Sequence, residues 1–212
     1  MTDLGDARLY HVAPATLPGG DLADLIPELA DAGVDLIQLR EKHMEAGDII
    51  RVGSRLLEVC RGAGVPFVLN DRPDVALALG ADGVHVGQND LPAEFARRMI
   101  GEAGILGLST HAPGEVDHAL DHAHLLDYFV VGPVHETPTK PGRPAAGLEL
   151  VRYAAAQDTT LPWFAIGGID RYNLAEVIEA GARRIVVVRA ITEAPDPPAA
   201  AADLRQRLID AG

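Results

Sequence analysis

The sequence predicts an α/β fold in which residues 1–212 form a single (β/α)8 TIM-barrel domain. Three observations predict it. Eight short apolar runs recur along the chain, stretches of helical period lie between most of them, and glycines mark the returns from helix to strand. Strand followed by helix, repeated in this way, predicts parallel strands joined by right-handed crossovers, and eight such units suggest a closed barrel.

Most of the expected strands are nearly continuous in Val, Ile or Leu, which is typical of strands buried on both faces. In chain order they are LYHV (9–12), LIQL (36–39), FVLN (67–70), GVHVG (83–87), ILGLS (105–109), YFVVG (128–132), WFAIGG (163–168) and RIVVV (184–188). Helical periods appear in stretches such as DLADLIPELADAG, DVALALGAD and YNLAEVIEAGA. An open doubly wound sheet is the alternative. It normally carries a glycine-rich fingerprint after its first strand, and the APATLPGG that follows LYHV is not one.

The composition is that of a globular protein with an acidic surface. Hydrophobic residues make up 48% of the chain and charged residues 23%, which excludes a disordered protein. The net charge of −13 argues against nucleic acid or an anionic membrane as a partner. The sequence shows no membrane span and no secretory signal, and its one cysteine, Cys60, lies in a helical pattern as an inert buried thiol. We therefore expect a cytoplasmic protein; homo-oligomers are possible, but the sequence does not indicate them.

Polar residues gather where the expected strands end, which is where a barrel of this type carries its chemistry. The chain has only two lysines against sixteen arginines, and both lysines, Lys42 and Lys140, come just after an apolar run. We therefore expect both lysines at one rim of the barrel. The further candidates at this rim are Arg40, Asn70, Asp71, Arg72, Gln88, Asn89, Asp90, Ser109, Thr110, His111, Thr137, Thr139, Gly167, Gly168 and Arg189.

Asp71 and Asp90 follow neighbouring expected strands, so their carboxylates could converge on one point. Two carboxylates that lie close together repel each other unless a cation lies between them. Mg²⁺ typically takes one or two protein carboxylates and completes its octahedron with water and substrate phosphate oxygens. The alternative is that both residues cap helices, Asp71 a helix that begins at Pro73 and Asp90 a helix near Pro92. The residues alone leave both interpretations open.

The sequence indicates places for two anionic groups. At the metal, Arg40, Lys42 and Lys140 would face the phosphates and neutralise the charge that the metal leaves over. At the other place, AIGGI leaves backbone amides open for close approach, and barrels of this class often bind phosphate there. A tight structural turn is the alternative role for Gly167 and Gly168.

Taken together, these segments resemble the thiamin phosphate synthase family. The resemblance follows the chain in order from the first strand to the last helix. It rests on QLREK, ND, ADGVHVGQNDLP, GLSTH, VGPVHETPTK, GLEL, AIGGI and VVVRAI. AIGGI alone is found in many phosphate-binding barrels, whereas the combination of QLREK, the paired ND and QND segments and TPTK is specific.

The resemblance implies a transferase with Mg²⁺ as its cofactor and two small molecules as its partners. Such an enzyme joins a hydroxymethylpyrimidine diphosphate to a thiazole phosphate and releases pyrophosphate. The family pattern assigns the pyrimidine diphosphate to Gln38, Arg40, Lys42 and Asn70, and magnesium to Asp71 and Asp90. It assigns the pyrimidine and its leaving group to Ser109 and Lys140, and the thiazole phosphate to Thr137, Thr139, Gly168, Val188 and Arg189.

The residue types suit this reaction. Diphosphate leaves from a carbon attached to an electron-rich aminopyrimidine, so no protein nucleophile is needed, and the protein supplies alignment and stabilisation of the departing charge. We expect Arg40, Lys42, Ser109 and Lys140 to act in this step. VVVRA departs from the family, which often has a serine where Arg189 stands. Either the guanidinium replaces the hydroxyl contact, or only the backbone amide at Arg189 is retained.

For four of the histidines the sequence suggests a role. His118 and His122 lie four residues apart on a helical stretch, and we expect a solvated helix face there, not a metal site. His85 is expected to pack inward, and His111 could act as a general base. The alternative functions are a thiazole tautomerase of the same fold and a non-catalytic barrel that senses thiamin precursors.

Overall fold

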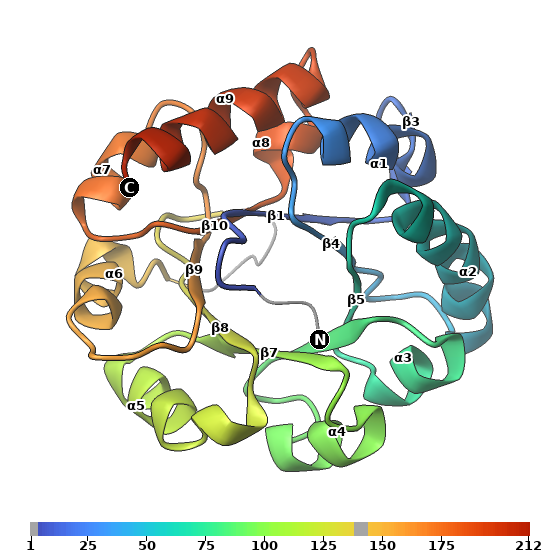
Figure 1. Cartoon of the computed structure of the whole chain (residues 1–212), viewed down its shortest axis with the longest axis horizontal. Helices are drawn as coiled ribbons and strands as arrows, with labels where there is room; N and C mark the ends of the chain where they lie inside the picture. The colour runs from blue at the N-terminus through green and yellow to red at the C-terminus, as the bar shows by residue number, and fades with distance from the viewer. Residues whose placement is uncertain (1–3, 138–143) are drawn as a thin grey trace.

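In the computed structural model, which describes residues 4–137 and 144–212, eight parallel strands close into a barrel with helices around it (Figure 1). The barrel strands are β1 (Leu9–Ala13), β4 (Leu36–Leu39), β5 (Phe67–Asn70), β6 (Gly83–Val86), β7 (Ile105–Thr110), β8 (Tyr128–Val131), β9 (Trp163–Ile166) and β10 (Ile185–Val187). Neighbouring strands follow one another in chain order, and β1 pairs with both β4 and β10 to close the ring. The prediction of a (β/α)8 barrel is confirmed, and each expected strand is present with ends that differ by no more than two residues.

Helices follow the barrel strands and cover their outer face. They are α1 (Leu22–Asp31), α2 (Ala46–Ala63), α3 (Pro73–Leu79), α4 (Ala93–Ile100), α5 (Pro113–Asp121), the 3₁₀ helix η1 (Ala123–Leu125), α6 (Gly147–Ala155), α7 (Leu174–Glu179), α8 (Arg189–Thr192) and α9 (Pro197–Asp210). A short hairpin of β2 (Thr16–Leu17) and β3 (Gly20–Asp21) was not predicted, because strands of two residues carry no periodic pattern. No helix in the described ranges is both long and apolar enough to cross a membrane.

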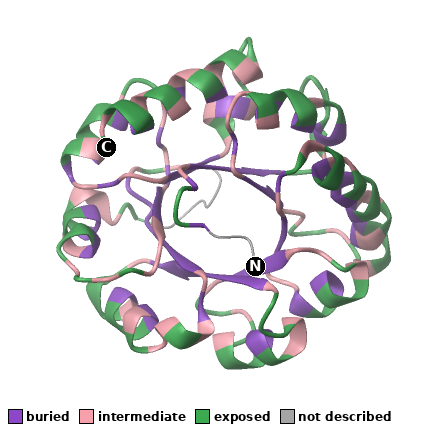
Figure 2. Ribbon diagram, viewed as in Figure 1, coloured by how far each residue is buried: buried purple, intermediate pink, exposed green. Residues whose placement is uncertain are grey.

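Burial on both faces explains the unbroken apolar strands (Figure 2). Side chains that point outward pack between the strands and the helices in one large cluster. Cys60 belongs to this cluster, and burial, followed by the charge of Asp82, raises the pKa of its thiol to about 12, which agrees with the expected inert thiol. A second cluster fills the barrel interior and includes Leu4 and Ala7 from the N-terminal segment.

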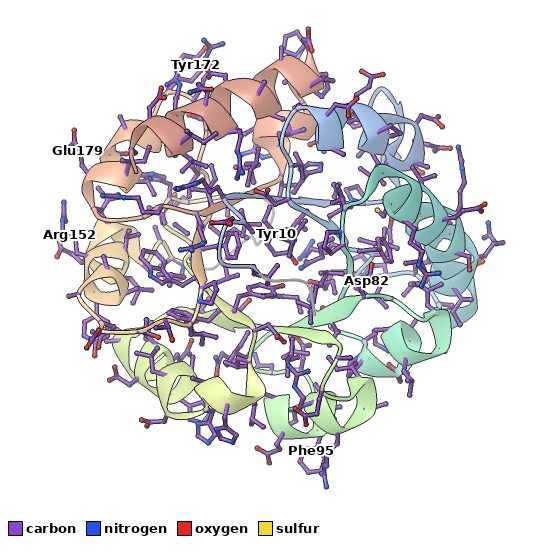
Figure 3. All side chains as sticks on the ribbon, in the orientation of Figure 1. Tyr10, Asp82, Phe95, Arg152, Tyr172 and Glu179 are labelled. Carbon is purple, nitrogen blue, oxygen red and sulfur yellow. The ribbon has the colours of Figure 1, made fainter. Side chains whose placement is uncertain are left out.

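Three aromatic rings fill the centre of the barrel, where Figure 3 labels Tyr10. Tyr10, Tyr128 and Phe164 are fully buried and meet edge to face, with ring centroids 5.6–5.7 Å apart. Gly107 makes room for this arrangement, since a Cβ at that position would lie 2.1 Å from Cζ of Tyr128. The aromatic rings therefore form a floor beneath the carboxyl ends of the strands.

Aspartates fasten the opposite, amino ends of the strands. Asp35, Asp82 and Asp127 each precede a strand and accept a hydrogen bond from an N–H group in the first two residues of the preceding strand, at 2.8–2.9 Å. Asp127 is also paired at 2.6 Å with Arg97, whose side chain is only 7% exposed. The Arg97 guanidinium further donates to the carbonyl oxygens of Leu125, Gly101 and Gly104. This face of the barrel is therefore built for stability.

We predict that Arg97→Met lowers the free energy of unfolding by about 3 kcal/mol, because it leaves a carboxylate and three carbonyl groups without their buried donor. Arg51→Met is the matched control. Arg51 pairs with Asp48 in solvent, with side chains 71% and 53% exposed, and its loss should cost at most about 1 kcal/mol. The measurement is urea denaturation followed by circular dichroism. Equal shifts in the two variants would contradict the role given to Arg97.

Candidate active site

Two cavities open at the carboxyl ends of the strands, with volumes of about 620 and 720 Å³. We call them the carboxylate cavity, which Asp71 and Asp90 line, and the glycine cavity, which Gly167 and Gly168 line. The two cavities share a wall formed by Ser109, His111, Val130, Ile166, Val186 and Val188. Molecules bound in both would therefore lie next to each other.

The structure brings most of the predicted site residues together, and it divides them between the two cavities. The carboxylate cavity is lined by Gln38, Arg40, Lys42, Asn70, Asp71, Asp90 and Ser109. The glycine cavity is lined by Thr137, Gly168, Val188 and Arg189, and also by Ser109. Thr139 and Lys140 lie outside the described residues.

Asp71 adopts an unusual backbone conformation directly after β5. Its φ of 63° is the only positive value at a non-glycine residue within the described ranges. Aspartate and asparagine enter this left-handed region more readily than other side chains, but they still do so at some cost. The N–H group of Asp71 donates to the carbonyl oxygen of His85 at 2.8 Å, which ties the strained residue to the neighbouring strand β6. The conformation holds the carboxylate at the rim.

The carboxyl group of Asp71 contacts a cation and a second carboxyl group. Lys42 Nζ lies 2.5 Å from Asp71 Oδ2, and the carboxyl group of Asp90 lies close enough to hydrogen-bond with Asp71 when one of the two is protonated. Burial alone would raise the pKa of Asp71. The hydrogen bonds from Lys42 and Asp90, together with the charge of Lys42, outweigh burial and lower that pKa. Asp71 is therefore the stronger acid of the pair.

The pKa of Asp90 shifts in the opposite direction, above its ordinary value. Burial raises its pKa and the hydrogen bond with Asp71 raises it further, whereas the N–H group of Gly87, which donates to Asp90 Oδ2 at 2.8 Å, acts in the other direction. Neither aspartate caps a helix, because α3 has Arg72 and α4 has Pro92 at the cap position, both without a side-chain cap bond. The capping alternative is therefore wrong, and the convergence of the two carboxyl groups is what the structure contains.

This donor set fits a hard divalent cation. Two carboxyl groups in contact, one of them with a raised pKa, form a place where positive charge is favoured. Among the described residues, no group of three or more His, Cys, Asp or Glu side chains is arranged to hold a metal. Two protein carboxylates are enough for an ion such as Mg²⁺, which keeps water ligands and binds phosphate oxygens. A structural metal site in which the protein supplies all four ligands would need more donors than these two.

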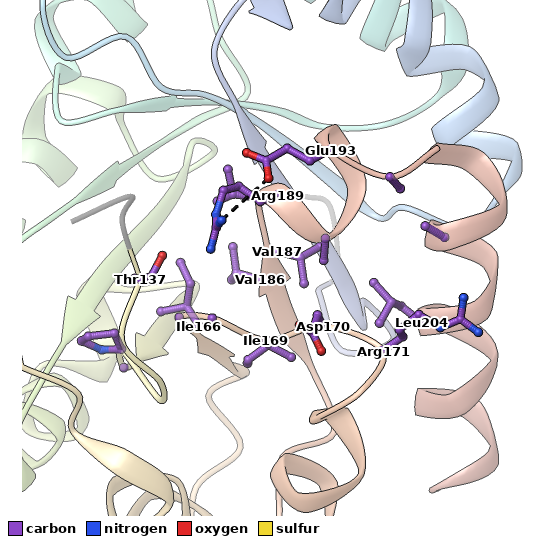
Figure 4. A pocket seen from close by; sticks show the side chains of 18 of the residues that line it. Thr137, Ile166, Ile169, Asp170, Arg171, Val186, Val187, Arg189, Glu193 and Leu204 are labelled. Carbon is purple, nitrogen blue, oxygen red and sulfur yellow. Dashed lines mark ion pairs between the residues drawn. The ribbon is translucent and has the colours of Figure 1, made fainter. Parts of the chain in front are cut away.

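The loop after β9 packs against the loop after β8. The N–H group of His135 donates to the carbonyl oxygen of Gly167 at 2.9 Å. A Cβ at Gly167, where φ is 109°, would lie 2.5 Å from Cα of Pro133, so only glycine fits. The tight turn is therefore present, and Gly167 and Gly168 also line the glycine cavity. Figure 4 shows Arg189 at this cavity, with a dashed line to Glu193. Arg189 Nη1 lies 3.7 Å from Glu193 Oε2.

The histidines divide as expected in two cases. His118 and His122 lie at the exposed end of α5 with ring centroids 4.2 Å apart, and His122 Nδ1 donates to the carbonyl oxygen of His118. His85 packs inward and is 7% exposed. His111 lies in the wall that the cavities share, with Nδ1 2.9 Å from Glu115 Oε2, a contact that fixes the orientation of the ring.

Sequence reasoning missed the polar floor of the carboxylate cavity. Tyr10 lines this cavity, and the hydroxyl of Tyr128 lies behind it, 2.9 Å from the Tyr10 hydroxyl; both residues were interpreted only as parts of apolar runs. The signal in the sequence was a hydroxyl-bearing or imidazole side chain in otherwise apolar strands, as in LYHV, GVHV and YFVV.

Comparison with known proteins gives a consistent result. The family model described as thiamine monophosphate synthase matches residues 9–191. The chain is 60% identical over 204 residues to a thiamine-phosphate synthase of Thermus thermophilus, covering 95% of this chain and 97% of that protein. It is 50% identical over 208 residues to one of Acidothermus cellulolyticus, covering 98% of each. A solved thiamine phosphate pyrophosphorylase of Pyrococcus furiosus superposes with a TM-score of 0.84 at 30% identity, covering 96% of each chain.

Asp90→Asn is predicted to raise the melting temperature of the metal-free protein at neutral pH by about 1–3 °C. The raised pKa of Asp90 means that its ionised form costs stability. This cost is present above the folded-state pKa and disappears as the pH falls below it. Asparagine keeps an acceptor for Gly87 and a donor for Asp71 without the charge. Thermal melts in a chelator at neutral and acidic pH test this, and a gain that persists below pH ~3.5, where the unfolded carboxyl is protonated too, would contradict it.

Proposed function

The chain belongs to the thiamine monophosphate synthase family, and we propose that it joins a hydroxymethylpyrimidine diphosphate to a thiazole phosphate in a Mg²⁺-dependent reaction. It is a transferase of thiamine biosynthesis, and the products of the proposed reaction are thiamin phosphate and pyrophosphate. One observation carries the proposal. A cavity that holds two carboxyl groups in contact and the side chains of Arg40 and Lys42 shares a wall with a second cavity lined by glycine backbone.

The proposed reaction needs no protein nucleophile. The bond between the exocyclic methylene carbon of the pyrimidine and the diphosphate oxygen breaks, and both electrons leave with the diphosphate. The amino group of the ring donates electron density to the carbon that is left behind. The lone pair of the thiazole nitrogen then forms the new C–N bond. No proton has to move, so the protein contributes alignment and electrostatic stabilisation.

The carboxylate cavity supplies the groups that a leaving diphosphate requires. Arg40 can fork to two oxygens, whereas Lys42 is a compact point charge on a flexible stem. Asp71 and Asp90 would hold a divalent cation, which would supply Lewis-acid stabilisation of the negative charge on the diphosphate. Lys42, whose Nζ lies 2.5 Å from Asp71 Oδ2, would turn its ammonium group to a phosphate oxygen. Lys140, which lies outside the described residues, is proposed to join them.

The glycine cavity supplies the groups for the second substrate. Gly168 and the backbone at Val188 line it together with Thr137, and we propose that these hold the thiazole phosphate, with Thr139 as a further contact. Arg189 stands where the family often has serine, and its exchange of Glu193 for a phosphate would compensate for the missing hydroxyl. The shared wall, which includes Ser109, then keeps the two rings in contact.

We predict that Asp71→Asn lowers kcat for pyrophosphate release by about 10²–10³ and raises the Mg²⁺ concentration needed for half-maximal rate. Asparagine removes the charge but still accepts the left-handed backbone at this position, so the loss reports on the carboxylate and not on misfolding. Asp74→Asn is the control, because Asp74 is exposed and pairs with Arg72 on α3. Its rate should stay within about twofold of the unchanged protein.

The same assay separates the alternatives. Pyrophosphate release that requires both precursors and Mg²⁺ supports the synthase. Isomerisation of the thiazole phosphate alone would indicate a tautomerase, and binding of precursors without turnover would indicate a sensor. Full activity in both Asp71→Asn and Asp90→Asn would remove the metal assignment.

A further inference from the structure

Five buried side chains from five different strands form one chain of hydrogen bonds across the barrel interior. Gln38 Nε2 donates to the hydroxyl of Tyr10, and the hydroxyls of Tyr10 and Tyr128 lie 2.9 Å apart. The Tyr128 hydroxyl lies 3.1 Å from His85 Nδ1, and His85 Nε2 lies 2.8 Å from Ser109 Oγ. Each of the five residues is at most 7% exposed. The two residues at the ends of this hydrogen-bond chain, Gln38 and Ser109, both line the carboxylate cavity.

The first bond fixes the direction of all the others. The amide nitrogen of Gln38 donates to Tyr10, so the arrangement in which every hydroxyl proton has an acceptor has Tyr10 donating to Tyr128. In this arrangement Tyr128 donates to His85 Nδ1, and a neutral imidazole then carries its proton on Nε2. His85 Nε2–H donates to Ser109 Oγ, and the Ser109 proton remains for an acceptor in the cavity.

The surroundings keep this chain rigid. Burial raises the pKa of both phenols, most strongly that of Tyr128, so both are neutral donors at physiological pH. The imidazole of His85 is stacked on the Tyr128 ring with centroids 5.6 Å apart and an interplanar angle of 24°. The Tyr128 ring packs directly on Gly107, where a Cβ would lie 2.1 Å from Cζ of the ring. Buried networks whose inner members are all hydrogen-bonded favour one arrangement.

We propose that Tyr10, Tyr128 and His85 are positioning residues that give the floor of the carboxylate cavity a fixed polarity, with an acceptor at Gln38 Oε1 and a donor at Ser109 Oγ–H. The inference rests on the proposed function in one respect, which is that the ligand on this floor is the pyrimidine. An aminopyrimidine has an exocyclic N–H donor and ring-nitrogen acceptors, so it matches this pair of groups. A ring with an oxo group in place of the amino group would present the opposite pattern and be rejected.

The first test requires neither a variant nor a substrate. Nitrogen-15 chemical shifts distinguish a protonated from an unprotonated ring nitrogen, and His85 in the free protein should carry its proton on Nε2 with Nδ1 unprotonated. A proton on Nδ1 instead would mean that the chain runs the other way, from Ser109 toward Gln38, and would overturn the proposal. This result does not depend on which reaction the protein catalyses.

The second test compares two replacements of the same histidine. In His85→Gln the amide nitrogen takes the place of Nε2 and can still donate to Ser109, whereas His85→Asn can replace only Nδ1 and leaves Ser109 without its donor. We expect His85→Asn to raise KM for the pyrimidine diphosphate about tenfold and His85→Gln to restore most of that loss, with KM for the thiazole phosphate unchanged in both. Equal losses in the two variants, or equal changes in both KM values, would overturn the proposal.

Tyr128→Phe tests the middle of the chain. It removes the donor to Nδ1, so the Nε2–H form of His85 should no longer be the single form seen in the nitrogen-15 spectrum, and KM for the pyrimidine diphosphate should rise about fivefold. Tyr153→Phe is the matched control, because Tyr153 donates to Asp117 on the protein surface. An unchanged imidazole spectrum in Tyr128→Phe would contradict the proposal that Tyr128 sets the proton position on His85. If the unchanged protein makes no pyrophosphate from the two precursors, the proposed function fails while the polarity of the chain is still decided by the spectrum.

Discussion

The contact between the carboxyl groups of Asp71 and Asp90 is the constraint on which the account of this site depends. Two like charges are brought together by adjacent strands and held there by a left-handed backbone at Asp71 and by the Gly87 N–H group on Asp90. Such an arrangement costs stability and persists only because the surrounding fold determines it. Lys42 relieves part of the cost from one side. The divalent cation and polyphosphate proposed for this cavity would relieve the rest.

The barrel separates stability from chemistry along its axis. At the amino ends of the strands, aspartates accept hydrogen bonds from strand N–H groups, and Arg97 satisfies several buried acceptors at once. The aromatic rings in the centre close the interior, and the polar chain around them forms the cavity floor. At the carboxyl ends, two cavities share one wall. This layout lets the loops above the strands carry substrate-binding groups without weakening the core.

The sequence predicted the fold well because strands buried on both faces leave unbroken apolar runs, and these set the strand positions to within two residues. It also placed Asp71 and Asp90 at the ends of neighbouring strands, where their carboxylates could converge, since adjacent parallel strands end side by side. It could not predict the Lys42–Asp71 ion pair or the choice between capping and convergence, which depend on the backbone at Asp71. The chain through Tyr10 and Tyr128 joins residues 118 positions apart, and only the closed barrel brings their hydroxyls together.

The most direct test is a crystal structure of the protein with pyrophosphate and Mn²⁺, which scatters anomalously and replaces Mg²⁺ at oxygen sites. We expect an anomalous peak in contact with the carboxylates of both Asp71 and Asp90, and Lys42 Nζ on a phosphate oxygen instead of on Asp71. A metal bound elsewhere, or Lys42 still paired with Asp71 beside an empty cavity, would contradict it.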